Sequence, residues 1–251
     1  MVAVSGFFPP RAWDHSVVPS LTSAGYRVVT FSHRGMPPSH VSRGGYTIEQ
    51  LADDCVGLML SLGFSKFFAL GASMGGLIVQ RMLLSNPDPV IAAACINGMG
   101  NYSAAGRILV EANFELCRLE ETPAALHRLI SYMGVQCPQY KENPEFYNKM
   151  IGAMTKEGLP PLQGRIGLSG ALVHWGQTDH MAEIADISVP CLALGSVHDH
   201  IFPSSLILEY SRLAEAIVYH ELCKSPHIFF LEAQEALAPV LDFFSGQLKE
   251  A

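Results

Sequence analysis

The sequence predicts an α/β protein with a doubly wound, mostly parallel β-sheet and a helical insertion. Short apolar runs rich in β-branched residues alternate with amphipathic stretches, which is typical of β-α repeats. The runs show no polar alternation, as expected for strands that are buried on both faces of a parallel sheet. One long segment, residues 101–186, contains only helix-like stretches and interrupts the alternation.

The predicted elements cover most of the chain. Six apolar runs are predicted to be strands: residues 2–5, 26–32, 66–71, 90–96, 189–195 and 216–222. Five stretches between them are predicted to be helices: residues 11–23, 47–62, 74–86, 204–215 and 231–248. Thr47 and Gln50 have the spacing of a capping box, which indicates where the second helix starts. We therefore expect a core of residues 1–100 and 187–251, with residues 101–186 as the insertion.

The composition narrows the range of partners. The formal net charge is −7 and no run of Lys or Arg is present, which argues against nucleic acid or an anionic membrane as the main partner. No apolar stretch reaches the roughly 20 residues that a membrane helix needs. The start of the chain, MVAVSGFF, lacks the basic region of a signal peptide. We expect a soluble cytoplasmic protein.

The cysteines show no C-x-x-C spacing, so no zinc or redox motif is predicted. Several lie in apolar runs, which favours buried free thiols in a reducing compartment; disulfides or a zinc site are the alternatives. The six are Cys55, Cys95, Cys117, Cys137, Cys191 and Cys223.

Residues 69–80 read ALGASMGGLIVQ and place a serine, Ser73, at a predicted strand-to-helix turn. The stretch matches G-x-S-x-G, a turn so tight that the serine is held in a strained backbone conformation. Side chains at Gly71 or Gly75 would collide with the neighbouring strand and helix. The Ser73 hydroxyl is then exposed at the carboxyl end of the sheet, at a helix N-terminus that favours negative charge. A nucleotide-binding turn is the alternative, although neither G-x-G-x-x-G nor the P-loop pattern is present.

A serine nucleophile needs a base, and the base needs an orienting carboxylate. Asp199 and His227 each follow a predicted strand at the sheet edge where Ser73 is exposed, in the chain order expected for this motif. The alternatives are a solvated loop acid or helix N-cap for Asp199 and a packed histidine for His227. The flanking His198 and His200 are expected to be surface residues.

With these motifs the chain resembles the α/β-hydrolase superfamily along nearly its whole length. The resembling segments are residues 25–39 (strand four), 71–76 (nucleophile elbow), 184–199 (approach to the acid) and 225–232 (histidine loop). The resemblance implies that Ser73 is the nucleophile, His227 the base and Asp199 the orienting acid. It also implies that residues 101–186 form a cap over the site, and that no metal or organic cofactor is needed.

The resemblance further implies an oxyanion hole made by the backbone N–H groups of Phe7 and Met74. The chain departs from the family here, because the usual His-Gly of this loop is Ser5-Gly6 and the bracing histidine is lost. Ser32 stands where the strand-four motif has aspartate. Compared with the family, the chain starts at the strand that is usually third, so we expect a sheet that lacks the usual first two strands. The sheet edge left by them needs a cover, for which a homodimer is one candidate.

Three functions are compatible with these residues. The first is a serine hydrolase acting on an ester, thioester or lactone of an apolar small molecule, with Phe8, His174 and Trp175 as predicted pocket residues. The second is a non-hydrolytic cyclase, acyltransferase, lyase or epimerase, which the altered oxyanion loop and the short amino end favour. The R-G-x-P-P-S form of the strand-four segment also resembles relatives in natural-product biosynthesis. The third is a non-enzymatic receptor, against which the complete set of serine, aspartate and histidine argues.

Overall fold

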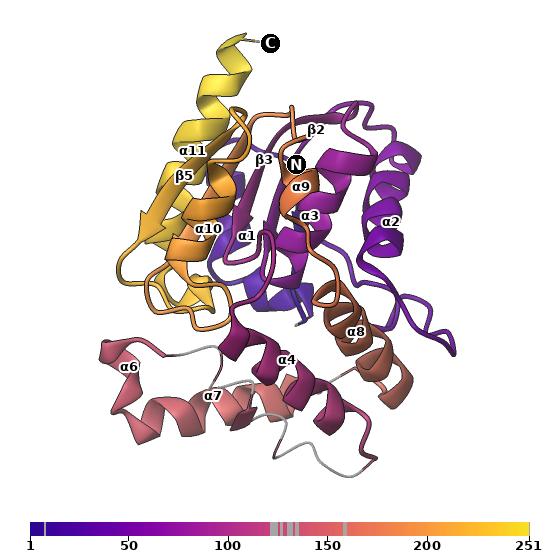
Figure 1. Ribbon diagram of the computed structural model, residues 1–251, viewed down its shortest axis with the longest axis vertical. Coiled ribbons are helices and arrows are strands. Elements are labelled where there is room, and N and C mark those ends of the chain that lie inside the picture. Colours follow the sequence, from indigo (N-terminus) through magenta and orange to yellow (C-terminus); the bar gives the residue numbers. More distant parts are fainter. Residues whose placement is uncertain are drawn as a thin grey trace.

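The structure is a computed structural model that describes residues 1–7, 9–120, 125, 128–129, 133, 136–157 and 160–250. A five-stranded sheet lies at the centre, in the order β1-β2-β3-β4-β5, and every neighbouring pair of strands is parallel (Figure 1). The strands are β1 (Val2–Val4), β2 (Phe67–Ala72), β3 (Val90–Ile96), β4 (Cys191–Ser196) and β5 (Ile217–Leu222). The predicted α/β class with a parallel sheet is confirmed.

Helices cover both faces of the sheet. They are α1 (Val17–Ser23), α2 (Ile48–Ser61), α3 (Met74–Ser85), α10 (Ser204–Ser211) and α11 (Ala233–Glu250). Alternate strand residues point to opposite faces: Val2 packs in one apolar core with α2, α3 and α10, while Ala3 packs in another with α1 and α11. α2 begins at the predicted capping box, because Thr47 and Gln50 each accept the other's backbone N–H. The sheet is therefore doubly wound, as predicted.

The predicted strand at residues 26–32 is reduced to a single bridge, between Val29 and Val2. The Ala3 N–H donates to the Val29 carbonyl and the Val29 N–H donates to the Met1 carbonyl, each at 2.9 Å. β1 is only three residues long, so it offers this segment few partners. The prediction of a full sixth strand was wrong, although the segment pairs with β1 on the side away from β2.

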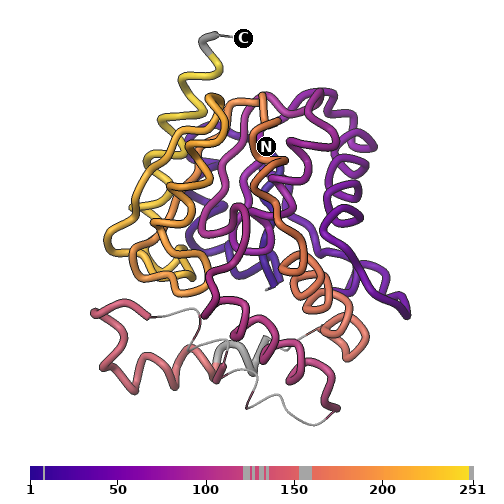
Figure 2. The backbone as a smooth tube through the Cα atoms, viewed as in Figure 1, coloured from indigo at the N-terminus to yellow at the C-terminus, as the bar shows by residue number. Residues whose placement is uncertain are grey.

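The described chain between β3 and β4 contains helices and no strand. They are α4 (Ala104–Cys117), α6 (Pro138–Lys141), α7 (Pro144–Glu157), α8 (Leu162–Trp175) and α9 (Met181–Ile184). α4, α6, α7 and α8 gather at one end of the molecule, and α4 packs against α8 (Figures 1 and 2). α8 also touches the core, where the backbone of Gly164 lies so close to that of Gly35 that a Cβ would overlap the Gly35 carbonyl. Residues 101–186 are called the insertion below.

The cysteines lie in the described part of the chain, and none is joined in a disulfide. Five are buried and Cys223 is exposed. Burial raises the pKa of Cys117 to about 11, which keeps this thiol protonated and unreactive at neutral pH. Within the same residue ranges, no helix combines the length and the apolar character that crossing a membrane requires.

Candidate active site

Ser73 lies in the sharp turn between β2 and α3. Its φ of 55° and ψ of −123° are outside the regions that L-residues commonly adopt. The turn is possible because Gly71 and Gly75 have no side chains: a Cβ on Gly71 would overlap the Gly75 carbonyl, and a Cβ on Gly75 would overlap the Val4 carbonyl of β1. The Ser73 N–H donates to the Ile96 carbonyl of β3 at 2.9 Å, which fixes the turn against the sheet.

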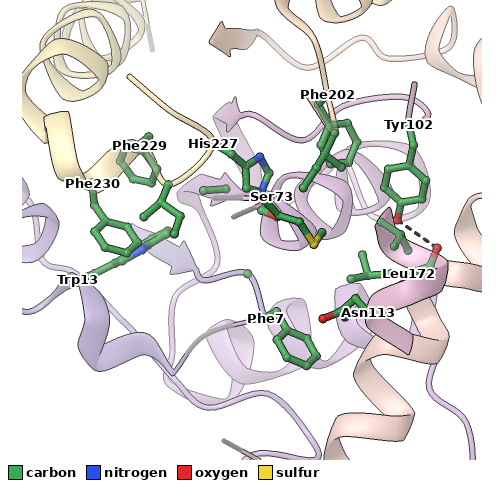
Figure 3. A pocket seen from close by; sticks show the side chains of 16 residues that line it. Phe7, Trp13, Ser73, Tyr102, Asn113, Leu172, Phe202, His227, Phe229 and Phe230 are labelled. Carbon is green, nitrogen blue, oxygen red and sulfur yellow. Dashed lines mark hydrogen bonds between the residues drawn. The ribbon is translucent and has the colours of Figure 1, made fainter. Parts of the chain in front are cut away.

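The turn brings Ser73, His227 and Asp199 together. Ser73 Oγ lies 2.9 Å from His227 Nε2, and His227 Nδ1 lies 2.6 Å from Asp199 Oδ2. The three residues follow β2, β5 and β4, so one edge of the sheet supplies all of them (Figure 3 shows Ser73 facing His227). With Nδ1–H donating to the carboxylate, Nε2 is free of a proton and accepts the Ser73 hydroxyl.

Asp199 is held by the backbone that follows it. The N–H groups of Ile201 and Phe202 donate to Oδ1 at 2.8 and 3.0 Å, which leaves Oδ2 for His227. The Asp199 side chain is 0% exposed, so its attraction for the imidazole acts away from water. The alternative of a solvated loop acid is therefore wrong for this residue.

Asn97 positions the histidine loop and was missed by the sequence reasoning. It follows β3 with a φ of 50° and is fully buried. Its Nδ2 donates to the carbonyls of Pro226 and His227 at 3.2 and 3.1 Å, and its Oδ1 accepts the Ser196 N–H at 2.9 Å. One side chain thus ties the loop that carries His227 to the ends of β3 and β4. The only sequence signal is an asparagine directly after a buried strand.

His33 braces the loop after β1, a role that the sequence did not reveal. Its Nε2 lies 2.9 Å from the Ser5 carbonyl. Burial lowers the pKa of His33, against the opposing effect of this hydrogen bond, so the imidazole is neutral and Nε2–H donates. The braced loop lies against the nucleophile: a Cβ on Gly6 would be 3.2 Å from Ser73 Cβ. A histidine from the strand-four segment therefore supports the loop whose own histidine is absent.

The two residues expected to form the oxyanion hole, Phe7 and Met74, directly follow Gly6 and Ser73, which lie close together. Phe7 follows Gly6 and lines the pocket in front of Ser73. Met74 is the first residue of α3, where a backbone N–H has no acceptor within the helix. Their backbone N–H groups come from the two segments that meet at the nucleophile.

Ser73 and His227 face an apolar pocket with a cavity volume of about 90 Å³ (Figure 3). The core contributes aromatic side chains to its wall, and the insertion contributes side chains from and near α4 and α8. The described residues that line it include no Lys, Arg, Asp or Glu. Representative lining residues are Trp13, Phe202 and Phe229 from the core and Tyr102, Asn113 and Leu172 from the insertion.

The structure does not confirm Phe8, Trp175 or His174 as pocket residues. Phe8 lies outside the described residues. Trp175 does not line the pocket: it is buried, stacks on His180 with ring centroids 3.6 Å apart, and donates its Nε1–H to the Gly100 carbonyl at 2.8 Å. His174 lies in the last turn of α8 and is exposed. These two predictions are corrected, because the face of α8 that meets the pocket carries Leu172 instead.

Across the described ranges, no group of three or more His, Cys, Asp or Glu side chains is arranged to hold a metal ion. The chemistry that the arrangement can perform on its own is the transfer of a proton from Ser73 to His227 and attack by the resulting oxygen on an electrophile.

Comparisons with known proteins agree with this architecture. The family model described as the alpha/beta hydrolase fold matches residues 11–234. A Mycobacterium tuberculosis protein that bears the name of a non-heme bromoperoxidase, BpoC, is 26% identical over 248 residues, which cover 94% of this chain and 89% of that protein. An Agrobacterium fabrum protein that bears the name of a carbamate hydrolase, RutD, is 24% identical over 203 residues, covering 79% and 73%.

Solved structures show the same fold at lower identity. The crystal structure of BpoC has a TM-score of 0.86 at 22% identity and covers 98% of this chain and 91% of that chain. The enol-lactonase of Burkholderia xenovorans has a TM-score of 0.82, also at 22% identity, and covers 97% and 90%.

Proposed function

The chain belongs to the α/β-hydrolase family, and we propose that it is a serine hydrolase that cleaves an ester, thioester or lactone of an apolar small molecule through an acyl-enzyme. The proposal is carried by the hydrogen-bonded chain from Ser73 through His227 to Asp199 in the wall of an apolar pocket. The names of two relatives, a carbamate hydrolase and an enol-lactonase, support the same class. Carbamates and lactones each present an acyl carbon that a serine hydroxyl can attack.

In the acylation half-reaction, Ser73 Oγ attacks the acyl carbon while its proton passes to His227 Nε2. The carbonyl oxygen becomes an oxyanion, which the N–H groups of Met74 and Phe7 stabilise; each such donor commonly contributes about 3–4 kcal/mol. His227 then gives its proton to the leaving alcohol or thiol. The bond to the leaving group breaks, and the acyl group remains esterified to Ser73.

In the deacylation half-reaction, His227 takes a proton from water, and the resulting hydroxide attacks the acyl-Ser73 carbon. The ester bond breaks, the Ser73 oxygen recovers its proton from His227, and the carboxylic acid leaves. The buried Asp199 carboxylate stabilises the imidazolium in both half-reactions and keeps Nδ1 protonated.

The lining of the pocket supports an apolar, uncharged substrate. A charged group there would lose its hydration without gaining a partner, which is costly. Because Tyr102 and Leu172 of the insertion line the pocket with core residues, the insertion acts as a cap that selects the substrate.

The test is kcat/KM for para-nitrophenyl esters, thioesters and lactones with wild type, Ser73→Ala and His227→Ala. Both variants are expected to lose at least about a thousandfold in kcat/KM. The matched control is Ser245→Ala, an exposed serine of α11, which should match wild type. Turnover that survives Ser73→Ala but not His227→Ala would contradict the acyl-enzyme and favour the cyclase, lyase or epimerase hypothesis.

A further inference from the structure

Asn113 of α4 is a buried polar side chain in the apolar pocket. The residue is 5% exposed. Its Oδ1 is completely buried and has no hydrogen-bond partner among the described residues. Figure 3 shows this oxygen pointing into the pocket, toward the side where Phe7 and Ser73 lie.

The helix gives no structural reason for an asparagine at this position. The buried residues of α4 are Gly106, Val110, Asn113 and Cys117, which recur at helical spacing and form its packed stripe. Such a stripe is expected to be apolar throughout. Asparagine is also a weak helix former, because its side chain competes for backbone hydrogen bonds. A buried polar atom without a partner is uncommon in a folded protein and calls for an explanation, and one that fits a side chain in a pocket wall is a contact with a bound ligand.

The pocket determines what kind of group completes the contact. Because Oδ1 is the unpartnered atom, the group must donate a hydrogen bond. Because the described lining holds no acidic or basic side chain besides His227, the group must be neutral. A hydroxyl or an amide N–H satisfies both conditions, whereas an ammonium does not.

We propose that Asn113 is a specificity-determining residue that accepts a hydrogen bond from a hydroxyl or amide N–H on the substrate. This inference rests on the proposed function and narrows it. The preferred substrate is an ester, thioester or lactone whose apolar body carries one neutral hydrogen-bond donor, held by α4 while Ser73 attacks the acyl carbon.

The test compares matched para-nitrophenyl esters with and without a hydroxyl at the β or γ carbon of a short acyl chain. Wild type should prefer one of the hydroxy esters over its plain counterpart. In Asn113→Leu the ratio of the two kcat/KM values should fall about 10- to 100-fold. Glu111→Gln, an exposed change on the same helix, is the control and should keep the wild-type ratio. Asn113→Ala tests the same loss with a smaller side chain, should leucine not fit.

Thermal unfolding separates this role from a structural one. Removing an unpartnered buried polar group should raise the melting temperature of Asn113→Leu in the absence of substrate. Turnover that depends on Ser73 with an unchanged ratio in both Asn113 variants overturns this inference and leaves the proposed function standing. Loss of thermal stability in Asn113→Leu with an unchanged ratio assigns the residue to packing. Absence of any Ser73-dependent turnover overturns the proposed function and this inference with it.

Discussion

Replacing Asp199 with asparagine should inactivate the protein without unfolding it, because the structure fixes how the new amide must point. Asp199 Oδ1 accepts the N–H groups of Ile201 and Phe202. In Asp199→Asn only the amide oxygen can accept these two donors, so the NH₂ group must face His227. His227 Nδ1 must then accept a hydrogen bond, and the ring proton moves to Nε2, where it blocks proton transfer from Ser73.

The expected loss of kcat follows from this change of tautomer. The same substitution in a Ser-His-Asp protease lowers kcat about ten-thousand-fold with the geometry retained. That loss corresponds to about 5.4 kcal/mol of transition-state stabilisation. We expect a loss of similar size here, because the distances of 2.6 and 2.9 Å describe the same chain of contacts.

The assay is kcat at saturating ester, beside circular dichroism and thermal unfolding of Asp199→Asn. Asp242→Asn, an exposed change on α11, is the matched control and should behave as wild type. A variant that keeps more than about a tenth of wild-type kcat while remaining folded would refute the assigned role of Asp199.

Three further predictions concern the supports of the site. Gly75→Ala should lose more than about 3 kcal/mol of unfolding free energy, because the new Cβ overlaps the Val4 carbonyl. The control Gly246→Ala, where a Cβ meets open space, should gain about 0.5–1 kcal/mol. Equal melting temperatures of the two variants would contradict the tight turn. Asn97→Gly should lose roughly 3 kcal/mol of unfolding free energy, because the hydrogen bonds of the side chain are lost. Asn97→Ala should lose about 1–2 kcal/mol more, because alanine is strained at a φ of 50°. The reverse order of the two variants in urea unfolding would refute the backbone argument. Burial lowers the folded-state pKa of His33, so the unfolded chain binds more protons and stability falls as pH drops below about 6.5. The pH dependence of unfolding should be shallower in His33→Gln than in wild type, and an unchanged slope would count against a neutral buried His33.

The parallel sheet and the nucleophile turn could be predicted because their signals are local. Buried parallel strands form continuous apolar runs, and the turn at Ser73 needs glycines at fixed positions whatever the rest of the chain does. Asp199 and His227 could be proposed from their places after predicted strands, since parallel strands end at one edge. The structure brings both side chains into contact with Ser73 in that order.

The supports of the site could not be predicted, because each depends on residues far apart in the chain. Asn97 binds a loop about 130 residues further along the chain. His33 of the strand-four segment binds the Ser5 carbonyl in the loop after β1. Trp175 looked like a pocket residue, yet the packing of α8 buries it against His180. Asn113 carried a usable signal, since it interrupts an apolar helical stripe, but its orientation toward the pocket is visible only in three dimensions.

The most direct test of the acyl-enzyme is covalent labelling with a serine-directed fluorophosphonate, followed by peptide mass spectrometry. We expect one adduct, on the peptide that contains Ser73, and no adduct in Ser73→Ala. An adduct on another residue, or labelling that persists in Ser73→Ala, would contradict it.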